Sequence, residues 1–165
     1  MTNSVEKKRA LLLRRPDEKD WPRILEILKI VNYHRIGGSE MPAFPLADCF
    51  VAEVDGRIAG VAGYRILDLR TAKTTLMAVD PVFRNHGLGM ALQRARMDYL
   101  RTKGIRHLYT NSDDEKVINW YCRHFGYRPT GERVPKTEDF GLSDKTEWTT
   151  LVCNLYPQGT GGACA

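Results

Sequence analysis

Two closely spaced glycines stand where an apolar run passes into an amphipathic one, within the stretch from Val79 to Leu92. Glycines at such a junction let backbone N–H groups approach an anion closely, and the N-terminus of the following helix adds about half a positive charge. The pattern predicts a site for the pyrophosphate of a phosphorylated cofactor. A plain loop with a glycine at the helix N-cap is the alternative interpretation.

Two common phosphate-binding patterns do not match this stretch. The dinucleotide fingerprint GxGxxG needs a third glycine where Leu92 stands, and several residues separate the strand end at Val79 from Gly87. A Walker A loop is excluded because no Lys-Ser or Lys-Thr pair follows the glycines. The spacing therefore argues against a nicotinamide dinucleotide and against a P-loop nucleotide site.

The composition is that of an ordinary globular domain, with 165 residues, 42% hydrophobic content and a net charge of +5. The positive charge favours an anionic ligand, but no basic element interleaved with aromatic residues predicts binding to nucleic acid. The cysteines form no CxxC pair and have no histidine at ligand spacing, so neither a zinc site nor a disulfide framework is predicted. They are Cys49, Cys122, Cys153 and Cys164.

No signal peptide is predicted from the N-terminal residues. Residues 1–9 are polar and charged, without the apolar core of a signal peptide, and no apolar run approaches the length of a membrane span. We expect a cytoplasmic protein with no membrane partner. Residues 10–156 are expected to form a single domain, between a disordered lead at 1–9 and a flexible tail at 157–165.

The order of apolar runs and turn signals predicts an α+β fold. In the first half we expect a strand, a helix, an irregular loop and three strands, the first two of these three joined by a tight turn at Asp55-Gly56. Their ranges are Leu11–Leu13, Trp21 to about Asn32, His34–Asp48, Cys49–Val54, Arg57–Tyr64 and Thr71–Val79.

The second half is expected to alternate helices and strands. A helix should run from Leu88 to a stop at Gly104, and a strand should follow over Ile105–Thr110. Ser112 and Glu115 have the spacing of a capping box for a second helix, which should end at Gly126. Two further strands are expected at 127–134 and 148–156. Hairpin strands combined with a strand–helix–strand unit predict a mixed, mostly antiparallel central sheet with flanking helices.

Two segments resemble motifs of one enzyme family. Val79-Asp80-Pro81 followed by Arg84-Asn85-His86-Gly87-Leu88-Gly89 resembles the RxxGxG signature of the GNAT N-acetyltransferases. Asn119-Trp120-Tyr121-Cys122-Arg123-His124-Phe125-Gly126-Tyr127 resembles their second motif, with an Asn, a Tyr and a terminal Phe-Gly-aromatic. The resemblance runs from about Leu11 to Tyr156. It implies the GNAT fold and transfer of an acetyl group from acetyl-CoA to a primary amine.

The resemblance also implies a role for individual residues. The loop and helix start would hold the pyrophosphate, the end of the preceding strand would pair with the pantetheine arm, and the arm would pass through a splay between that strand and the next. The implied cofactor-binding residues are Met77, Ala78, Val79, Arg84, Asn85, His86, Gly87, Leu88, Gly89, Met90 and Asn119. Tyr121 would lie beside the sulfur.

Acyl transfer from a thioester to an amine needs a neutral amine, a donor for the developing oxyanion, and a proton for the departing thiolate. A tyrosine with a pKa near 10 is close enough to a thiol with a pKa of about 8.5 to provide that proton. Backbone N–H groups near Val79 are expected to bind the oxyanion. Tyr121 is therefore the candidate general acid, and a core aromatic without a chemical role is the alternative for it.

One departure from the family pattern concerns the general base. Many relatives carry a glutamate on the strand before the glycine loop, whereas Ala72–Val79 contains no carboxylate. Glu40, Asp113 and His34 are candidates for the base, a water chain is another, and no base is needed if the amine arrives neutral.

The missing carboxylate also raises a second hypothesis, a non-catalytic module that binds CoA thioesters or acts as an interaction domain. The acceptor stays open among a peptide N-terminus, a lysine side chain, a polyamine, an amino sugar and an amino acid. A homodimer is left open as well.

Overall fold

The computed structural model describes residues 10–31, 43–137, 141–142 and 144–156. The expectations for the lead at 1–9, for the tail at 157–165, and for His34 and Glu40 concern residues outside these ranges.

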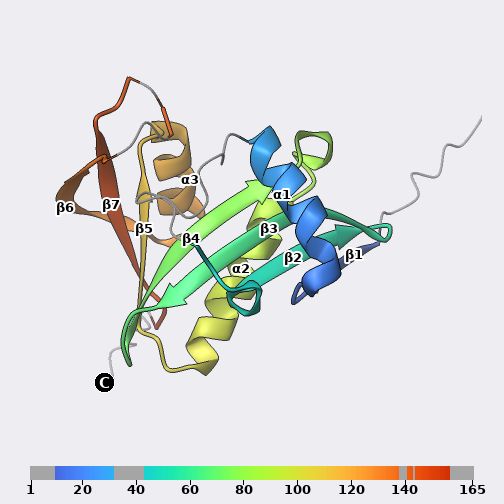
Figure 1. The fold of residues 1–165 in the computed structure, drawn as a ribbon. Coiled ribbons are helices and arrows are strands. Elements are labelled where there is room, and N and C mark those ends of the chain that lie inside the picture. The colour runs from blue at the N-terminus through green and yellow to red at the C-terminus, as the bar shows by residue number, and fades with distance from the viewer. Residues whose placement is uncertain (1–9, 32–42, 138–140, 143, 157–165) are drawn as a thin grey trace, which may run out of the picture.

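Seven strands form one sheet in the order β1-β2-β3-β4-β5-β7-β6. The pairs β1–β2, β2–β3, β3–β4, β5–β7 and β6–β7 are antiparallel, and β4–β5 is parallel, which confirms the expected mixed and mostly antiparallel sheet. Figure 1 shows the strands fanning across the molecule. Their bounds are β1 Leu11–Arg14, β2 Cys49–Val54, β3 Arg57–Ile66, β4 Thr71–Val79, β5 His107–Ser112, β6 Arg128–Pro135 and β7 Glu147–Asn154.

Three α-helices flank the sheet, with α1 on one face and α2 on the other (Figure 1). Short 3-10 turns precede α1, β2 and α2. The helical segments are η1 Glu18–Asp20, α1 Trp21–Ile30, η2 Leu46–Asp48, η3 Pro81–Phe83, α2 Leu88–Thr102 and α3 Glu115–Phe125. The tight turn predicted between β2 and β3 is present, with positive φ at both Asp55 and Gly56.

The predicted start of α3 is wrong. Ser112 is the last residue of β5, where pairing with Thr149 of β7 keeps its backbone extended. The cap is Asp114, whose side chain accepts a hydrogen bond of 2.8 Å from the N–H of Lys116. A sequence pattern shows the spacing of a capping box but not the strand pairing that competes for the same residue. The predicted helix end is confirmed, because Gly126 adopts the left-handed conformation there.

The strand predicted at 105–110 lies two residues later. The N–H of Ile105 donates to the carbonyl of Leu100 at 3.1 Å, so this residue belongs to the C-terminal turn of α2. The other predicted elements agree with the structure to within about two residues wherever they lie in the described ranges.

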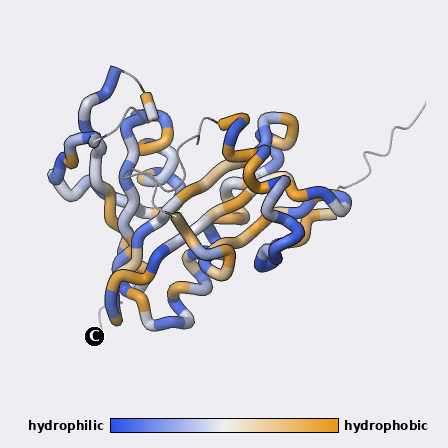
Figure 2. Tube along the Cα trace, viewed as in Figure 1, coloured by the Kyte–Doolittle hydropathy of each residue, from blue (hydrophilic) through white to orange (hydrophobic). Residues whose placement is uncertain are grey.

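Both faces of the sheet carry a core. On one face, Ile24, Ile27 and Leu28 of α1 pack against β2, β3 and β4. On the other, α2 and α3 contribute to one buried cluster that includes Met97 and Phe125. Figure 2 shows the apolar residues following the central strands between these helices. The helices on the second face therefore meet over β4 and β5.

Candidate active site

The parallel strands β4 and β5 are paired over only three residues each. Thr71–Lys73 pair with His107–Tyr109, and β4 then continues from Thr74 to Val79 without β5 beside it. At the point of separation the hydroxyl oxygens of Thr74 and Thr110 lie 2.6 Å apart. The expected splay between the two strands is thus confirmed, and it opens toward the carboxyl ends of both.

A bulge in β4 lies next to the point where the strands separate. Gly63 of β3 pairs with Leu76 and Tyr64 pairs with Thr74, so Thr75 has no residue opposite it. Nη1 of Arg96, on α2, donates to the carbonyls of Gly63 and Leu76 at 2.7 and 3.0 Å. The local register of β4 is therefore tied to α2 through one guanidinium.

The glycine loop presents backbone N–H groups to one side. Asn85 and Gly87 both have positive φ, at 64° and 75°, and Gly87 is the N-cap of α2. Alternation of left-handed residues with others turns successive N–H groups toward a common point, which is an anion-binding geometry. The first turn of α2 contains no acidic residue, and no side chain caps it. Its N–H groups suit an external anion.

A side chain at position 89 could be accommodated without a clash with the rest of the protein. A Cβ atom built at this position would lie 3.8 Å from Cζ2 of Trp120 and 3.9 Å from Sδ of Met77, which are ordinary van der Waals distances. Gly89 is also not among the residues with positive φ. The fold would accept a side chain here, so this glycine fits a position where a ligand approaches the backbone.

Trp120 is a site residue that the sequence reasoning missed. It lies on α3, with Cζ2 3.8 Å from the point that a Cβ atom of Gly89 would occupy, and Sδ of Met77 lies 3.9 Å from the same point. Its neighbour Asn119, which was expected to contact the pantetheine arm, is exposed on α3. The available signal was that Trp120 stands between two residues of the second motif.

The remaining predicted cofactor residues are either packed against the core or exposed on the glycine loop. Met77 and Val79 pack toward α2, while Ala78 points to the α1 face, so only its backbone is available to a ligand in the splay. Leu88 is buried and anchors the helix start. Met90 is half-buried against the cluster beneath α2 and α3. The loop residues are exposed: Arg84, Asn85, His86 and Gly87.

Tyr121 is a buried aromatic with a polar end. Only 6% of it is exposed, and its ring centroid lies 5.0 Å from that of Trp120 and 4.9 Å from that of Tyr127. Its hydroxyl oxygen lies 3.4 Å from Nη2 of Arg96. The ring thus belongs to the core, whereas the hydroxyl lies beside a cation that also contacts β4.

Asp113, a candidate for the general base, is committed to an ion pair. Its carboxylate lies 2.7 Å from Nζ of Lys136, and the two side chains are only 8% and 6% exposed. The same ammonium lies 4.6 Å from the ring centroid of Trp148. These contacts join the end of β5 to the segment after β6, which makes Asp113 a structural residue.

Asp80 stabilises the turn that precedes the glycine loop. Its side chain accepts from the N–H of Val82 at 3.0 Å and pairs with Nη2 of Arg23 on α1. Burial by itself raises the pKa of the Asp80 carboxyl, but the Val82 N–H and the Arg23 guanidinium outweigh it and hold the pKa below its usual value. The ionised carboxylate therefore stabilises the turn that leads from β4 into the loop.

We expect Asp80→Ala to lower the free energy of unfolding by about 2 kcal/mol, because a largely buried guanidinium then keeps only the more exposed Glu26 as its carboxylate partner. Urea denaturation measures the loss. Since the folded-state pKa is lowered, this contribution is present above the unfolded value of about 3.9 and disappears as the pH falls below it. Asp98→Ala is the matched control: Asp98 is 72% exposed in its pair with Arg101, so about 0.5 kcal/mol or less is expected. Equal losses for both variants would contradict the assignment.

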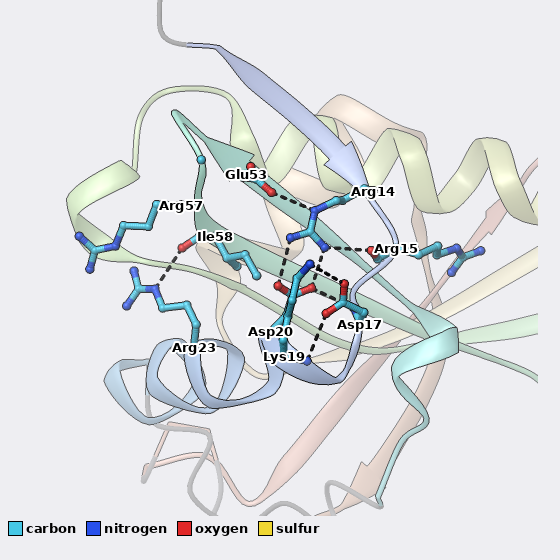
Figure 3. Close-up of a pocket in the computed structure, with 10 residues that line it drawn as sticks. Arg14, Arg15, Asp17, Lys19, Asp20, Arg23, Glu53, Arg57 and Ile58 are labelled. Carbon is cyan, nitrogen blue, oxygen red and sulfur yellow. Dashed lines mark hydrogen bonds and ion pairs between the residues drawn. The ribbon is translucent and has the colours of Figure 1, made fainter.

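A charged cavity of about 590 Å³ lies between β1, α1 and the β2–β3 turn (Figure 3). Arg14 donates to Asp20 and Glu53, and its pKa is raised by these hydrogen bonds. Arg23 donates to the carbonyl of Ile58 at 3.1 Å. These contacts are with the protein's own groups: Arg14 connects β1 to β2 and to η1, and Arg23 connects α1 to β3.

The arrangement of splay, glycine loop and helix N-terminus agrees with the comparison to known proteins. The sequence profile of the acetyltransferase (GNAT) family matches residues 13–127, which is more than half of the chain. The chain belongs to the GNAT family. Membership makes it an acyltransferase that uses acetyl-CoA as its donor, and the expected fold and reaction class are confirmed.

Two curated proteins illustrate the relationship of this GNAT chain. A putative ribosomal protein bS18-alanine N-acetyltransferase of Bacillus subtilis is 31% identical over 111 residues, which cover 65% of this chain and 71% of that protein. Mycothiol acetyltransferase of Actinosynnema mirum is 35% identical over 81 residues, covering 47% of this chain but only 27% of that protein.

The fold of this GNAT chain also matches solved structures. Ard1 of Thermoplasma volcanium superposes with a TM-score of 0.71 at 20% identity, over 88% of this chain and 97% of that chain.

Among the described residues, no helix is both long and apolar enough to cross a membrane.

Proposed function

We propose that this GNAT enzyme transfers an acetyl group from acetyl-CoA to a primary amine by direct attack on the thioester, with Tyr121 as the general acid. The observation that carries the proposal is the splay of β4 from β5 beside the glycine loop, with the Tyr121 hydroxyl linked to β4 through Arg96. Cofactor and acid would thus meet at one opening in the sheet.

The glycine loop and the first turn of α2 would bind the pyrophosphate through backbone N–H groups. Arg84 and His86 are exposed on this loop and add positive charge or a donor at its rim. The pantetheine arm would lie along Met77–Val79, where β4 has an unpaired edge, and the Trp120 ring would form the opposite wall. These roles follow from placement and backbone chemistry.

The proposed reaction begins when the acceptor nitrogen forms a bond to the thioester carbonyl carbon, and backbone N–H groups on the unpaired edge of β4 stabilise the oxyanion. Collapse breaks the C–S bond, and the sulfur takes a proton from Tyr121. The nitrogen loses one proton to water, and the tyrosinate regains one from water. No carboxylate lies on β4, and the proposed route takes the amine in its neutral form.

The acceptor side is proposed to be the α1 face. An apolar cavity of about 360 Å³ lies there, lined by Glu18, Trp21, Phe44 and Leu46. Leu46 lies in η2, which immediately precedes β2. The first residue of β2, Cys49, pairs with Gly63, the residue of β3 next to the β4 bulge. An amine with an apolar part, such as a peptide N-terminus, fits this lining. The alanine acceptor in the name of the Bacillus subtilis relative favours the same class.

The test is release of free CoA thiol from acetyl-CoA across an amine panel. The panel contains a peptide with N-terminal alanine, its N-acetylated form as the matched control, a lysine-containing blocked peptide, spermidine, glucosamine and glycine. We expect thiol release with at least one free amine, at a rate that rises with pH as the amine deprotonates. We expect no thiol release with the N-acetylated form of the alanine peptide. Saturable acetyl-CoA binding without turnover for every amine would instead support the non-catalytic module.

A further inference from the structure

Arg96 is a fully buried cation in the middle of α2, with no exposed surface. Its partners in the described part of the chain are the carbonyls of Gly63 and Leu76, the amide oxygen of Gln93 and the hydroxyl of Tyr121. None of these is a carboxylate. A buried charge without a counter-ion opposes folding, because it loses hydration and gains no opposite charge in return.

Two titratable groups that feel the charge of this guanidinium stay neutral. Burial raises the pKa of the Cys49 thiol on β2 to about 12, and burial also raises the pKa of Tyr127 well above its usual value. Within the described part of the chain, Arg96 therefore carries the charge of this cluster, and Tyr121 is the phenol whose oxygen it contacts directly.

The guanidinium also connects two parts of the splay. Nη1 donates to the carbonyls of Gly63 and Leu76, the paired residues of β3 and β4 next to the bulge, and Nη2 lies 3.4 Å from the Tyr121 oxygen. Arginine has donors only, so in this contact the tyrosine oxygen accepts. Its own proton is then available to another acceptor. The contact is long for a hydrogen bond between these groups, and contacts of catalytic groups commonly shorten when the substrate binds.

We propose that Arg96 is a positioning residue of the active site, which holds the Tyr121 oxygen and leaves the hydroxyl proton directed to the departing sulfur. When the C–S bond breaks, the sulfur takes that proton, and the tyrosinate formed is stabilised by the positive charge of Arg96 until water reprotonates it. The inference rests on the general-acid role proposed above for Tyr121.

The test is a double-variant cycle on the full chain, using the most active amine of the panel. The kcat and the KM for acetyl-CoA are measured against pH for Arg96→Met, Tyr121→Phe and the double variant. We expect Arg96→Met to lower kcat on the order of 10- to 100-fold, with KM changed by no more than about twofold. In the Tyr121→Phe background the same substitution should change kcat by no more than about twofold.

The split between kcat and KM separates positioning from a merely structural role, because a general loss of packing would not spare acetyl-CoA binding while removing only the rate that depends on Tyr121. Arg96→Lys keeps the positive charge and should recover part of the kcat that Arg96→Met loses. Arg96→Lys also replaces Arg96→Met in the double-mutant cycle if the methionine variant melts below the assay temperature. Arg94→Met, at an exposed arginine of the same helix, is the control for unchanged kinetics.

Losses that multiply in the double variant, or an Arg96→Lys variant no faster than folded Arg96→Met, would overturn the role of Arg96 while leaving the acid role of Tyr121 intact. Wild-type kcat for Tyr121→Phe would overturn the acid role itself. Non-multiplying losses together with partial recovery of kcat in Arg96→Lys establish the positioning role.

Discussion

The Gly89→Glu variant is expected to fold normally and to lose acetyl-CoA affinity by about three orders of magnitude. Two unit charges about 4 Å apart at a protein surface repel by roughly 4 kcal/mol, which corresponds to that factor in affinity. The loss follows from placing a carboxylate where α2 begins, at the proposed pyrophosphate site. Isothermal titration with acetyl-CoA measures it.

Folding should survive the same substitution for two reasons. A Cβ at this position meets Trp120 and Met77 only at ordinary contact distances. A negative charge in the first turn also interacts favourably with the helix dipole, by about 0.5 kcal/mol. The thermal midpoint without ligand should therefore be unchanged or slightly higher.

Gly89→Gln is the matched control, because it has the size of glutamate without the charge. We expect it to weaken binding by about tenfold or less, since bulk remains but repulsion is removed. Equal affinity of the glutamate variant and the wild type would refute the pyrophosphate assignment. Equal losses for both variants would mean that bulk alone acts at this position.

The Tyr121→Phe variant is expected to lower kcat on the order of 100- to 1,000-fold with little change in the KM for acetyl-CoA. Removal of a general acid typically costs this much, whereas the ring that packs between Trp120 and Tyr127 is retained. Steady-state kinetics over pH 6 to 10 measure it.

Tyr127→Phe provides the comparison within the same cluster. Its hydroxyl is buried and accepts a hydrogen bond of 3.1 Å from Gln93, and among the described residues no hydrogen bond joins it to β4 or to Arg96. We expect this variant to lose about 1 kcal/mol of stability and to keep kcat within about twofold. A wild-type rate for Tyr121→Phe across the pH range would remove Tyr121 from the acid role.

Local sequence chemistry predicted much of the fold. The Asp55-Gly56 turn, the helix stop at Gly126 and the strand over Thr71–Val79 depend on residues adjacent in the chain, and all are present. The start of α3 could not be read in this way. Pairing between Ser112 and Thr149, which are distant in the chain, decides where β5 ends.

The candidate site also has some features set by residues adjacent in the chain and others set by residues distant in the chain. The glycine loop and the second motif are contiguous segments, so their residue types and spacing by themselves determined the family and the donor and predicted the position of the pyrophosphate loop. Only the tertiary structure decided that Trp120 faces Gly89, that Lys136 neutralises Asp113, and that Arg96 is buried beside Tyr121. An arginine on an amphipathic helix is ordinarily placed in water, and burial depends on what the other elements bring over it. The packing of α2 and α3 over the splayed strands therefore set the charge around Tyr121, which no local pattern contains.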